Sequence, residues 1–405
     1  MQAVIMRRAI TITLLASLVL ALSMGMRQSF GLFQQPIAET FGIGLTAFSI
    51  SLAIQNLLWG LSQPIVGAIA DKYGSGRVIG VTAAAQVLGL FMLANADSIW
   101  ELHLSTGIII GIAGAGTTWA VLLSVVARNV PAHRRSLFFG LASSAGTGGQ
   151  IVIAPINQLT INAFGWVDAI VILALMLVVI IPLAFALKGR TADHSAGRQA
   201  AETLGAALNK ARKHSGYLYL TAGFYVCGFH VMFIMGHFPN FIRTAGLPDW
   251  LPGVAIAVIG LTNLVGTLLF GWLGDKYSKK YLLSTLYFLR ALVFAGFLLV
   301  PLSATSVLAF SFMLGFLWLA TVPLTNALVG QIFGLRYLAT LAGIVFASHQ
   351  LGSFTSLWLG GFLFDTRGDY DLIWQLSILL GLLSAVLHLP IKDKPLEPEP
   401  APAAS

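Results

Sequence analysis

Long apolar runs recur along almost the whole sequence. Each holds roughly 20 residues, enough for a helix rising 1.5 Å per residue to cross about 30 Å of hydrocarbon. Continuous rather than alternating hydrophobicity predicts helices instead of barrel strands, because backbone groups must be paired internally in lipid. We therefore expect an all-α membrane protein with twelve transmembrane helices. Their approximate cores are residues 9–34, 47–70, 77–96, 103–127, 136–160, 166–187, 216–242, 250–274, 281–301, 307–331, 338–364 and 371–391.

Composition and charge placement support this reading. Hydrophobic residues make up 57% of the chain and charged residues 9%, which excludes a soluble globular domain of this length. With the N-terminus inside, Arg243 and Arg367 are the basic residues left outside, so both termini are predicted to be cytoplasmic in a bacterial inner membrane. The net charge of +8 then needs no partner beyond anionic lipid, and no nucleic acid is expected. A single cysteine, Cys227, excludes an intrachain disulfide.

The only long polar stretch divides the runs six and six. We predict an N-terminal bundle at 1–187, a cytoplasmic linker at 188–215, a C-terminal bundle at 216–391 and a disordered tail at 392–405. Apolar positions within the linker follow a helical period, so part of it is expected to lie on the inner leaflet, with a regulatory docking site as the alternative. These positions are Leu204, Ala207, Leu208 and Ala211.

An internal repeat appears at an offset of 203 or 204 residues. Gly25-Met26-Arg27 aligns with Gly228-Phe229-His230, Gly111 with Gly315, and Gly149 with Gly352. Six helices in each half give both copies the same orientation, so the repeat axis is expected to run along the membrane normal. The sequence therefore predicts two pseudo-symmetric six-helix bundles that rock about a central site.

The loop GAIADKYGSGR, Gly67 to Arg77, returns as GWLGDKYSKK, Gly271 to Lys280. It is similar to the signature that follows the second helix in the major facilitator superfamily, with Gly67, Asp71, Lys72, Gly74 and Arg77 at its main positions and Gly271 and Asp275 in the second copy. The resemblance implies the twelve-helix carrier fold, alternating access and a conformational gate at these residues. A loop that only sets topology is the alternative.

Two departures from that family narrow the function. The fourth run reads HLSTGIIIGIAGAG and lacks the embedded arginine of many members, and the fifth reads GTGGQIVIAP, without the glycine–proline pattern of drug–proton antiporters. Multidrug efflux is therefore disfavoured. The chain resembles most the bacterial carriers akin to monocarboxylate and oxalate–formate transporters, although the helix 1 motif of animal monocarboxylate carriers is absent and Arg290 lies on helix 9 rather than helix 8.

The ionisable groups embedded in the runs are basic or neutral. None of the fifteen acidic residues falls in a helix core, whereas Arg27, His230, His349 and Arg290 do. A buried arginine costs roughly 2.5–3.5 kcal/mol on insertion scales, so Arg27 is expected to bind an anionic substrate unless it snorkels to the interface. His230 and His349 are expected substrate ligands and proton carriers, with neutral inter-helix hydrogen bonding as the alternative. Arg290, on an outer helix, is expected to be structural.

Neutral polar residues on the cavity helices complete the predicted substrate site: Gln150, Asn263, Trp318 and Thr325. Such residues also join helices to each other, which is the alternative for each of them. We expect a monomeric secondary transporter of a small organic anion, in first place a monocarboxylate, with proton coupling as a further expectation. A vitamin-like solute such as riboflavin is the main alternative, and a channel or membrane sensor a remote one. No enzyme activity, cofactor, metal or nucleotide site is expected.

Overall fold

The computed structural model describes residues 2–130, 135–187, 204–334 and 338–394, and it assigns no strand within them. Elements of the N-terminal bundle are α1 (Gln2–Ser29), η1 (Phe30–Phe33), α2 (Gln34–Phe41), α3 (Leu45–Tyr73), α4 (Ser75–Ala94), α5 (Ile99–Leu102), η2 (His103–Ile109), α6 (Ile110–Gly114), η3 (Ala115–Thr117), α7 (Trp119–Asn129), α8 (Arg135–Phe164), α9 (Trp166–Val178) and α10 (Ile180–Ala186). After them come α11 (Leu204–Lys213), α12 (Ser215–Thr244), α13 (Leu251–Lys276), α14 (Lys279–Leu299), α15 (Ala304–Leu317), α16 (Thr321–Phe333), α17 (Leu338–Arg367) and α18 (Asp371–His388).

The predicted all-helical membrane fold is confirmed. Within the described residues, ten helical stretches are long and apolar enough to cross a membrane. α8 and α17, each of 30 residues, coincide with the fifth and eleventh predicted runs and complete the twelve. Four runs are not the single helices that were expected. The first continues through η1 into α2, the fourth is divided into α5 to α7, the sixth is divided between α9 and α10, and the tenth is divided between α15 and α16.

Local sequence explains where several helices begin and end. Gly74 has a φ of +97°, a conformation that favours glycine, and this lets α3 end and α4 begin without an intervening loop. Ser303 and Ser306 form a capping box at the start of α15. Pro252 lies in the first turn of α13, where a missing backbone N–H costs nothing.

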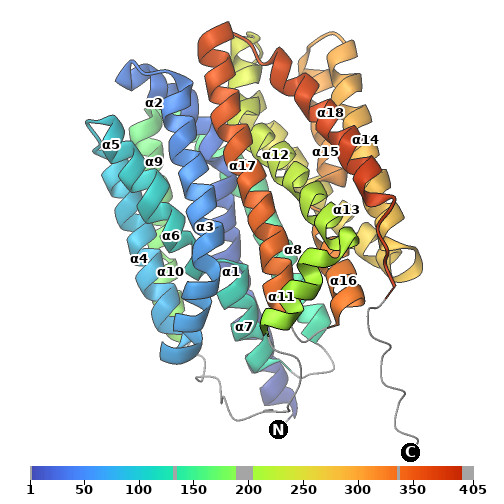
Figure 1. Ribbon diagram of the computed structural model, residues 1–405. Helices are drawn as coiled ribbons and strands as arrows, with labels where there is room; N and C mark the ends of the chain where they lie inside the picture. Colours follow the sequence, from blue (N-terminus) through green and yellow to red (C-terminus); the bar gives the residue numbers. More distant parts are fainter. Residues whose placement is uncertain (1, 131–134, 188–203, 335–337, 395–405) are drawn as a thin grey trace, which may run out of the picture.

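The described chain begins and ends at the same end of the molecule, which we call the terminus side, and α11 lies on this side at the edge of the C-terminal bundle, in contact with α12 (Figure 1). Ala207 and Ala211 are buried on α11, so its apolar face packs against the protein. The predicted linker residues 188–203 and the tail from 395 lie outside the described residues.

Close helix pairs preserve the sequence repeat in three dimensions. A Cβ atom added to Gly149 on α8 would collide with the carbonyl oxygen of Ala21 on α1, and one added to Gly352 on α17 would collide with that of Tyr225 on α12. Only a glycine permits two helix backbones to approach this closely. The pairs α1–α8 and α12–α17 are therefore equivalent, as the repeat predicts.

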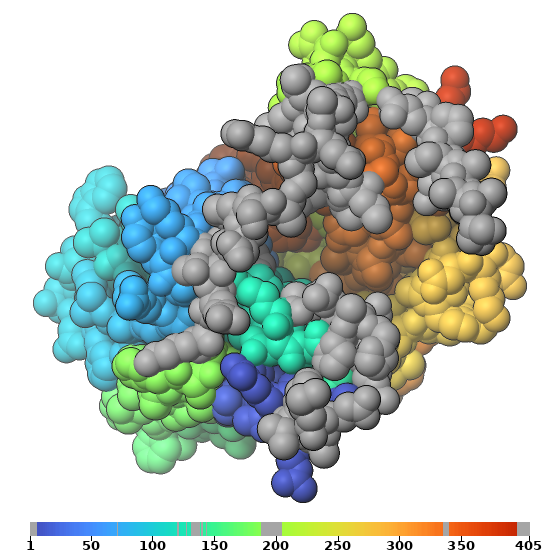
Figure 2. Space-filling model, turned by 90° about the horizontal axis from the view of Figure 1, so that it is seen from below, coloured from blue at the N-terminus to red at the C-terminus, as the bar shows by residue number. Residues whose placement is uncertain are grey.

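The seam between the bundles is formed by α3 against α17 and by α8 against α13. Along α3 and α17, a Cβ on Gly361 would lie 2.7 Å from Ser49 Oγ, and a Cβ on Gly60 would lie 2.5 Å from Gln350 Cγ. Two helical turns nearer the terminus side, Gly67 and Gly343 meet no atom within 4 Å. The bundles thus touch on the opposite side and diverge toward the terminus side, where the surface is hollowed between α7, in teal, and α17, in orange (Figure 2).

Two polar clamps cross the seam on the side opposite the termini. Asp365, near the end of α17, accepts hydrogen bonds from the backbone N–H groups of Leu45 and Thr46 at the start of α3, each at 2.8 Å. Arg243, at the end of α12, donates to the carbonyl of Leu32 at 3.0 Å and to Gln158 Oε1 at 3.2 Å. These contacts hold the opposite side closed while the terminus side is open.

Candidate functional site

Arg27 lies in the last turn of α1 and points into the N-terminal bundle. Its Nη2 donates to Asn56 Oδ1 on α3, and its Cζ lies 3.9 Å from the ring centroid of Trp59, one turn further along the same helix. Its Nε is buried and has no hydrogen-bond partner among the described residues. The guanidinium is therefore held in the interior by an amide oxygen and an aromatic face, and this geometry differs from that of a snorkelled side chain.

A small cavity adjoins the guanidinium. Its volume of about 10 Å³ is roughly what a single water molecule needs. Residues from α1, α3, α4 and the divided fourth span line it: Ser23, Met26, Arg27, Gln55, Trp59, Gln86, Ile110, Gly114 and Thr118. None of these lining residues is acidic, so the positive charge of Arg27 has no carboxylate beside it in the cavity.

Unpaired donors gather at this cavity. Ser23 Oγ and Gln55 Nε2 are buried and, like Arg27 Nε, have no partner in the described part of the chain. Leaving a buried donor unpaired costs about 1–3 kcal/mol. Three such donors around one small space leave room for a hydrogen-bond acceptor there, such as the oxygen of a water molecule or of a ligand.

Aromatic rings connect Arg27 to His349 across the seam. The Trp59 ring meets Phe346 of α17 edge-on, with centroids 5.6 Å apart, and Phe346 stacks on His349 at 5.4 Å with an interplanar angle of 9°. His349 Nδ1 also lies 3.0 Å from Gln350 Oε1, and Gln350 Nε2 donates to the Asn56 carbonyl at 2.6 Å. Trp59 and Phe346 thus lie between Arg27 and His349, which are on opposite bundles, and His349 itself does not line the cavity beside Arg27.

His230 faces a different direction. Its Nε2 lies 2.8 Å from the Ser377 carbonyl on α18, and its ring packs 4.9 Å from Phe294 on α14. It is fully buried on this outer side of the C-terminal bundle and is not brought together with Arg27. Ala21 and Tyr225, which are equivalent in the structure, lie 204 residues apart. At this offset His230 corresponds to Met26 and not to Arg27, with which the sequence repeat aligned it. One residue of register turns a helical side chain by about 100°, which explains the different direction.

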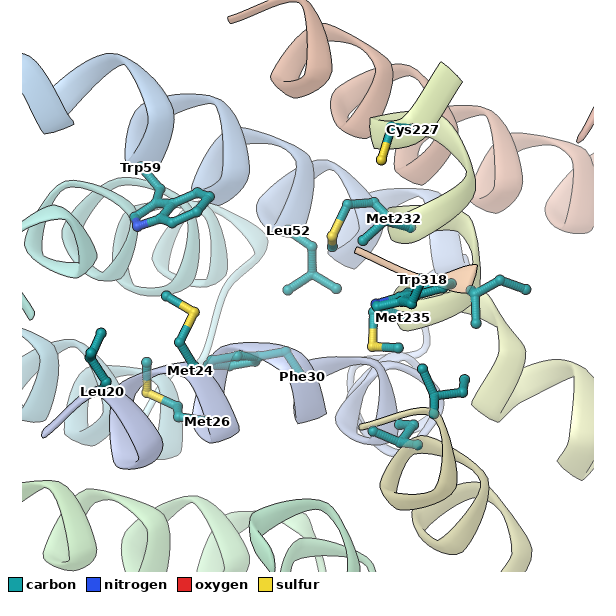
Figure 3. Packing of buried hydrophobic residues seen from close by; sticks show 14 of the residues in the cluster. Leu20, Met24, Met26, Phe30, Leu52, Trp59, Cys227, Met232, Met235 and Trp318 are labelled. Carbon is teal, nitrogen blue, oxygen red and sulfur yellow. The ribbon is translucent and has the colours of Figure 1, made fainter. Parts of the chain in front are cut away.

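The other predicted ligands are dispersed. Gln150 donates across the seam to the Ile256 carbonyl at 2.9 Å, and Asn263 Oδ1 accepts the Leu319 N–H at 2.9 Å in the break of the tenth span. Trp318 is fully buried in that break beside Met232 and Met235, apart from Trp59 (Figure 3). Thr325, on α16, is also buried. None of these four lines the cavity beside Arg27.

Arg290 stabilises the break between α15 and α16. Its Nε and Nη2 donate to the Leu317 carbonyl at 3.0 and 2.7 Å, and Nη2 also donates to the Trp318 carbonyl. A cation at a helix C-terminus satisfies carbonyls that have no partner within the helix. In the N-terminal bundle, Gln86, 204 residues earlier, accepts from Thr117 Oγ1 at 3.2 Å beside the break of the fourth span.

The signature loop lies at the terminus side. Lys72 and Arg77 are exposed, as is Asp275 at the end of α13, and Gly271 has no atom within 4 Å of an added Cβ. The side chain of Asp71 lies outside the described residues. Of the signature glycines, Gly67 stands on the α3 side of the seam where the two bundles have diverged.

Sequence reasoning did not identify Ser23, Gln55, Trp59 and Gln86 as residues that line the cavity beside Arg27. All four are neutral and are spread over three runs, so neither charge nor spacing sets them apart. A signal for two of them exists in the second run, where Gln55 and Trp59 lie four residues apart and share a helical face.

Comparisons with known proteins agree with this architecture. The family model described as Major Facilitator Superfamily matches residues 13–356. The uncharacterised MFS-type transporter YcxA of Bacillus subtilis is 27% identical, covering 94% of this chain and 95% of its own, and monocarboxylate transporter 13 of Bos taurus is 23% identical, covering 86% and 81%. A solved bacterial homologue of the human lysosomal transporter Spinster, in an inward-facing and unoccupied conformation, superposes with a TM-score of 0.76 at 14% identity, covering 94% of this chain and 96% of that one. The chain therefore belongs to the Major Facilitator Superfamily of membrane transporters.

Proposed function

We propose that this carrier moves a small organic anion, in first place a monocarboxylate, across the bacterial inner membrane. The observation that carries the proposal is Arg27: its guanidinium faces an internal cavity whose lining residues include no acid. A guanidinium pairs well with a carboxylate because its planar fork matches two oxygens. Several relatives of this chain are named monocarboxylate transporters, which supports the same substrate class.

In the proposed cycle, the terminus side faces the cytoplasm and the open hollow admits or releases the anion there. The anion supplies the countercharge that Arg27 lacks, which lowers the cost of enclosing the guanidinium when the bundles close over it. Closure on the terminus side would bring Gly67 toward Gly343 and would place Asp71 and Asp275 at the gate. Rocking of the bundles then exposes the site to the other side.

His349 is the proposed proton carrier. It lies on the opposite bundle from Arg27 and is joined to it through Phe346 and Trp59 and through Gln350 and Asn56. Protonation of His349 would therefore add a positive charge at the seam, close to the proposed substrate position. His230 has no such connection to Arg27 and is not retained in this role.

Uptake into proteoliposomes tests the proposal. Purified carrier would be assayed with radiolabelled lactate, pyruvate, oxalate, formate and riboflavin. Arg27→Gln should raise KM for the transported carboxylate by roughly 10- to 100-fold, since a charge-assisted hydrogen bond contributes about 1.5–3 kcal/mol. Arg367→Gln, at an exposed arginine at the end of α17, is the matched control and should behave as the parent.

Two results would contradict the proposal. Carboxylate uptake that survives Arg27→Gln unchanged would remove Arg27 from the site, and uptake of riboflavin without any carboxylate would replace the substrate class. Proton coupling is tested separately: an imposed pH gradient should accelerate uptake in the parent but not in His349→Gln.

A further inference from the structure

We propose that the cavity beside Arg27 is a carboxylate subsite contained wholly in the N-terminal bundle, in which Ser23, Gln55 and the N-terminus of α7 bind the head group together with Arg27. This inference rests on the proposed function, because it assigns a position to the carboxylate of the transported anion. It adds two ligands and a helix end that the sequence does not reveal.

The first observation is the uncapped start of α7. This helix of eleven residues begins at Trp119, directly after the break of the fourth span, and its N-cap Thr118 makes no side-chain capping bond. The Thr118 hydroxyl instead accepts from Trp59 Nε1 at 3.1 Å, and Thr118 itself lines the cavity. The first N–H groups of a helix carry a partial positive charge and favour an anion.

The second observation is independent of the helix end. Ser23 and Gln55 are 1% and 2% exposed, and both line the cavity. Their Oγ and Nε2 atoms have no hydrogen-bond partner among the described residues, and the same holds for Arg27 Nε. Buried polar side chains are normally paired, so three unpaired donors in one small space indicate an acceptor that is bound during function.

The equivalent position in the C-terminal bundle is filled by side chains of the protein itself. At an offset of 204, Ser23 corresponds to Cys227 and Gln86 to Arg290. There the guanidinium of Arg290 already donates hydrogen bonds to the carbonyls of Leu317 and Trp318. The C-terminal counterpart is thus filled by the chain's own groups, whereas the N-terminal one keeps its donors available. This asymmetry predicts one subsite per carrier.

The size of the cavity limits the head group. Room for about a single water molecule suits one oxygen of a planar carboxylate better than the three oxygens of a tetrahedral sulfonate. Acetate should therefore bind more tightly than methanesulfonate, although both carry one negative charge on a methyl group.

Binding to the purified full-length carrier in nanodiscs tests the subsite. Sodium acetate and sodium methanesulfonate are titrated, and binding is followed by tryptophan fluorescence, with Trp59→Phe identifying the signal from the cavity. Gln55→Leu and Ser23→Ala should each weaken acetate binding by about 10- to 100-fold, and Gln55→Glu, which places a like charge beside the ligand, should abolish it. Matched controls are Gln63→Leu, a second α3 glutamine whose amide nitrogen is buried and unpaired, and Ser17→Ala on α1; both lie outside the cavity and should leave binding unchanged.

The outcomes separate the subsite from the proposed function. Carboxylate transport that depends on Arg27 while Gln55→Leu and Ser23→Ala match their controls overturns the subsite and leaves the function intact. Loss of acetate binding in both variants supports the subsite. If the same carrier transports no carboxylate, the subsite stands and the proposed function is overturned. Methanesulfonate binding as tight as acetate overturns the carboxylate assignment. If Gln55→Leu does not fold, Gln55→Asn, which shortens the same amide, takes its place with the same expectation.

Discussion

Replacing Asp365 by asparagine is expected to loosen the closed side of the seam. The Asp365 carboxylate spans the two bundles: Oδ1 accepts the Leu45 N–H at 2.8 Å, and Oδ2 accepts the Thr46 N–H at 2.8 Å and the Thr46 hydroxyl at 2.5 Å. It therefore caps α3 from the other bundle. Because the contact joins the two bundles, which separate on this side in the proposed cycle, it should stabilise only the conformation closed on this side.

The size of the effect follows from these bonds. Asparagine keeps one oxygen, so an N–H of α3 loses its acceptor and the helix end loses its negative charge. Removing a helix cap costs about 0.5–2 kcal/mol, and Asp365 is exposed, which excludes the larger values of buried pairs. The equilibrium should therefore shift about 2- to 30-fold toward the conformation open on this side.

Cysteine labelling measures this shift. Ser49 lies fully buried on α3 beneath Gly361, so Ser49→Cys in a Cys227→Ser background reports opening of the seam. Its rate of reaction with a membrane-impermeant methanethiosulfonate should rise by the same 2- to 30-fold in Asp365→Asn. Asp369→Asn is the control, because that exposed carboxylate accepts only from Asp371 in its own loop among the hydrogen bonds described. An unchanged rate in Asp365→Asn, or an equal rise in Asp369→Asn, would refute the clamp.

Three further predictions concern stability, and thermal unfolding in detergent measures each. Arg290→Gln should cost about 2–4 kcal/mol, because carbonyls at the break of the tenth span lose their donors; an unchanged melting temperature would contradict this role. Gly149→Ala should cost about 1–3 kcal/mol by forcing α8 from α1, whereas Gly148→Ala, which meets no atom within 4 Å, should change little; equal effects would argue against close packing. Burial and the nearby Lys392 lower the pKa of His214, whose neutral ring accepts the first-turn N–H of α12. Its stabilisation is therefore fully present above pH 6.5 and is lost as the pH falls through the folded pKa, and His214→Asn, which keeps a capping acceptor, should show a smaller loss between pH 7.5 and 5.

The sequence predicts the membrane helices and their repeat because both depend on patterns that extend over many residues. Hydrophobicity summed over twenty residues identifies each span, and recurring glycines mark the helix pairs that approach most closely. The breaks of the fourth and tenth spans escape prediction because the segments 115–118 and 317–320 contain neither a charged residue nor a proline. Tertiary bonds, such as those of Arg290 and Asn263 to the segment 317–319, hold the backbone out of the helix there.

The candidate site was only partly predictable for a different reason. Arg27 and His349 stand out because charge is rare in these runs. The direction of a side chain depends on helix register to within one residue, and a repeat offset of either 203 or 204 could not fix it for His230. Gln55 and Ser23 stand out only in three dimensions, because their buried donors have no hydrogen-bond partner among the described residues.

The glycine contacts between α1 and α8 have a mechanical consequence. Because Gly149 brings backbone against backbone, neither helix can slide or tilt without displacing the other. α8 is also one of the helices that meets the opposite bundle, through Gln150 and Ile256. In the proposed cycle, an anion that draws in the Arg27 side chain on α1 would therefore also displace α8, and α8 would carry this displacement to the seam as a rigid body, with no local unfolding required.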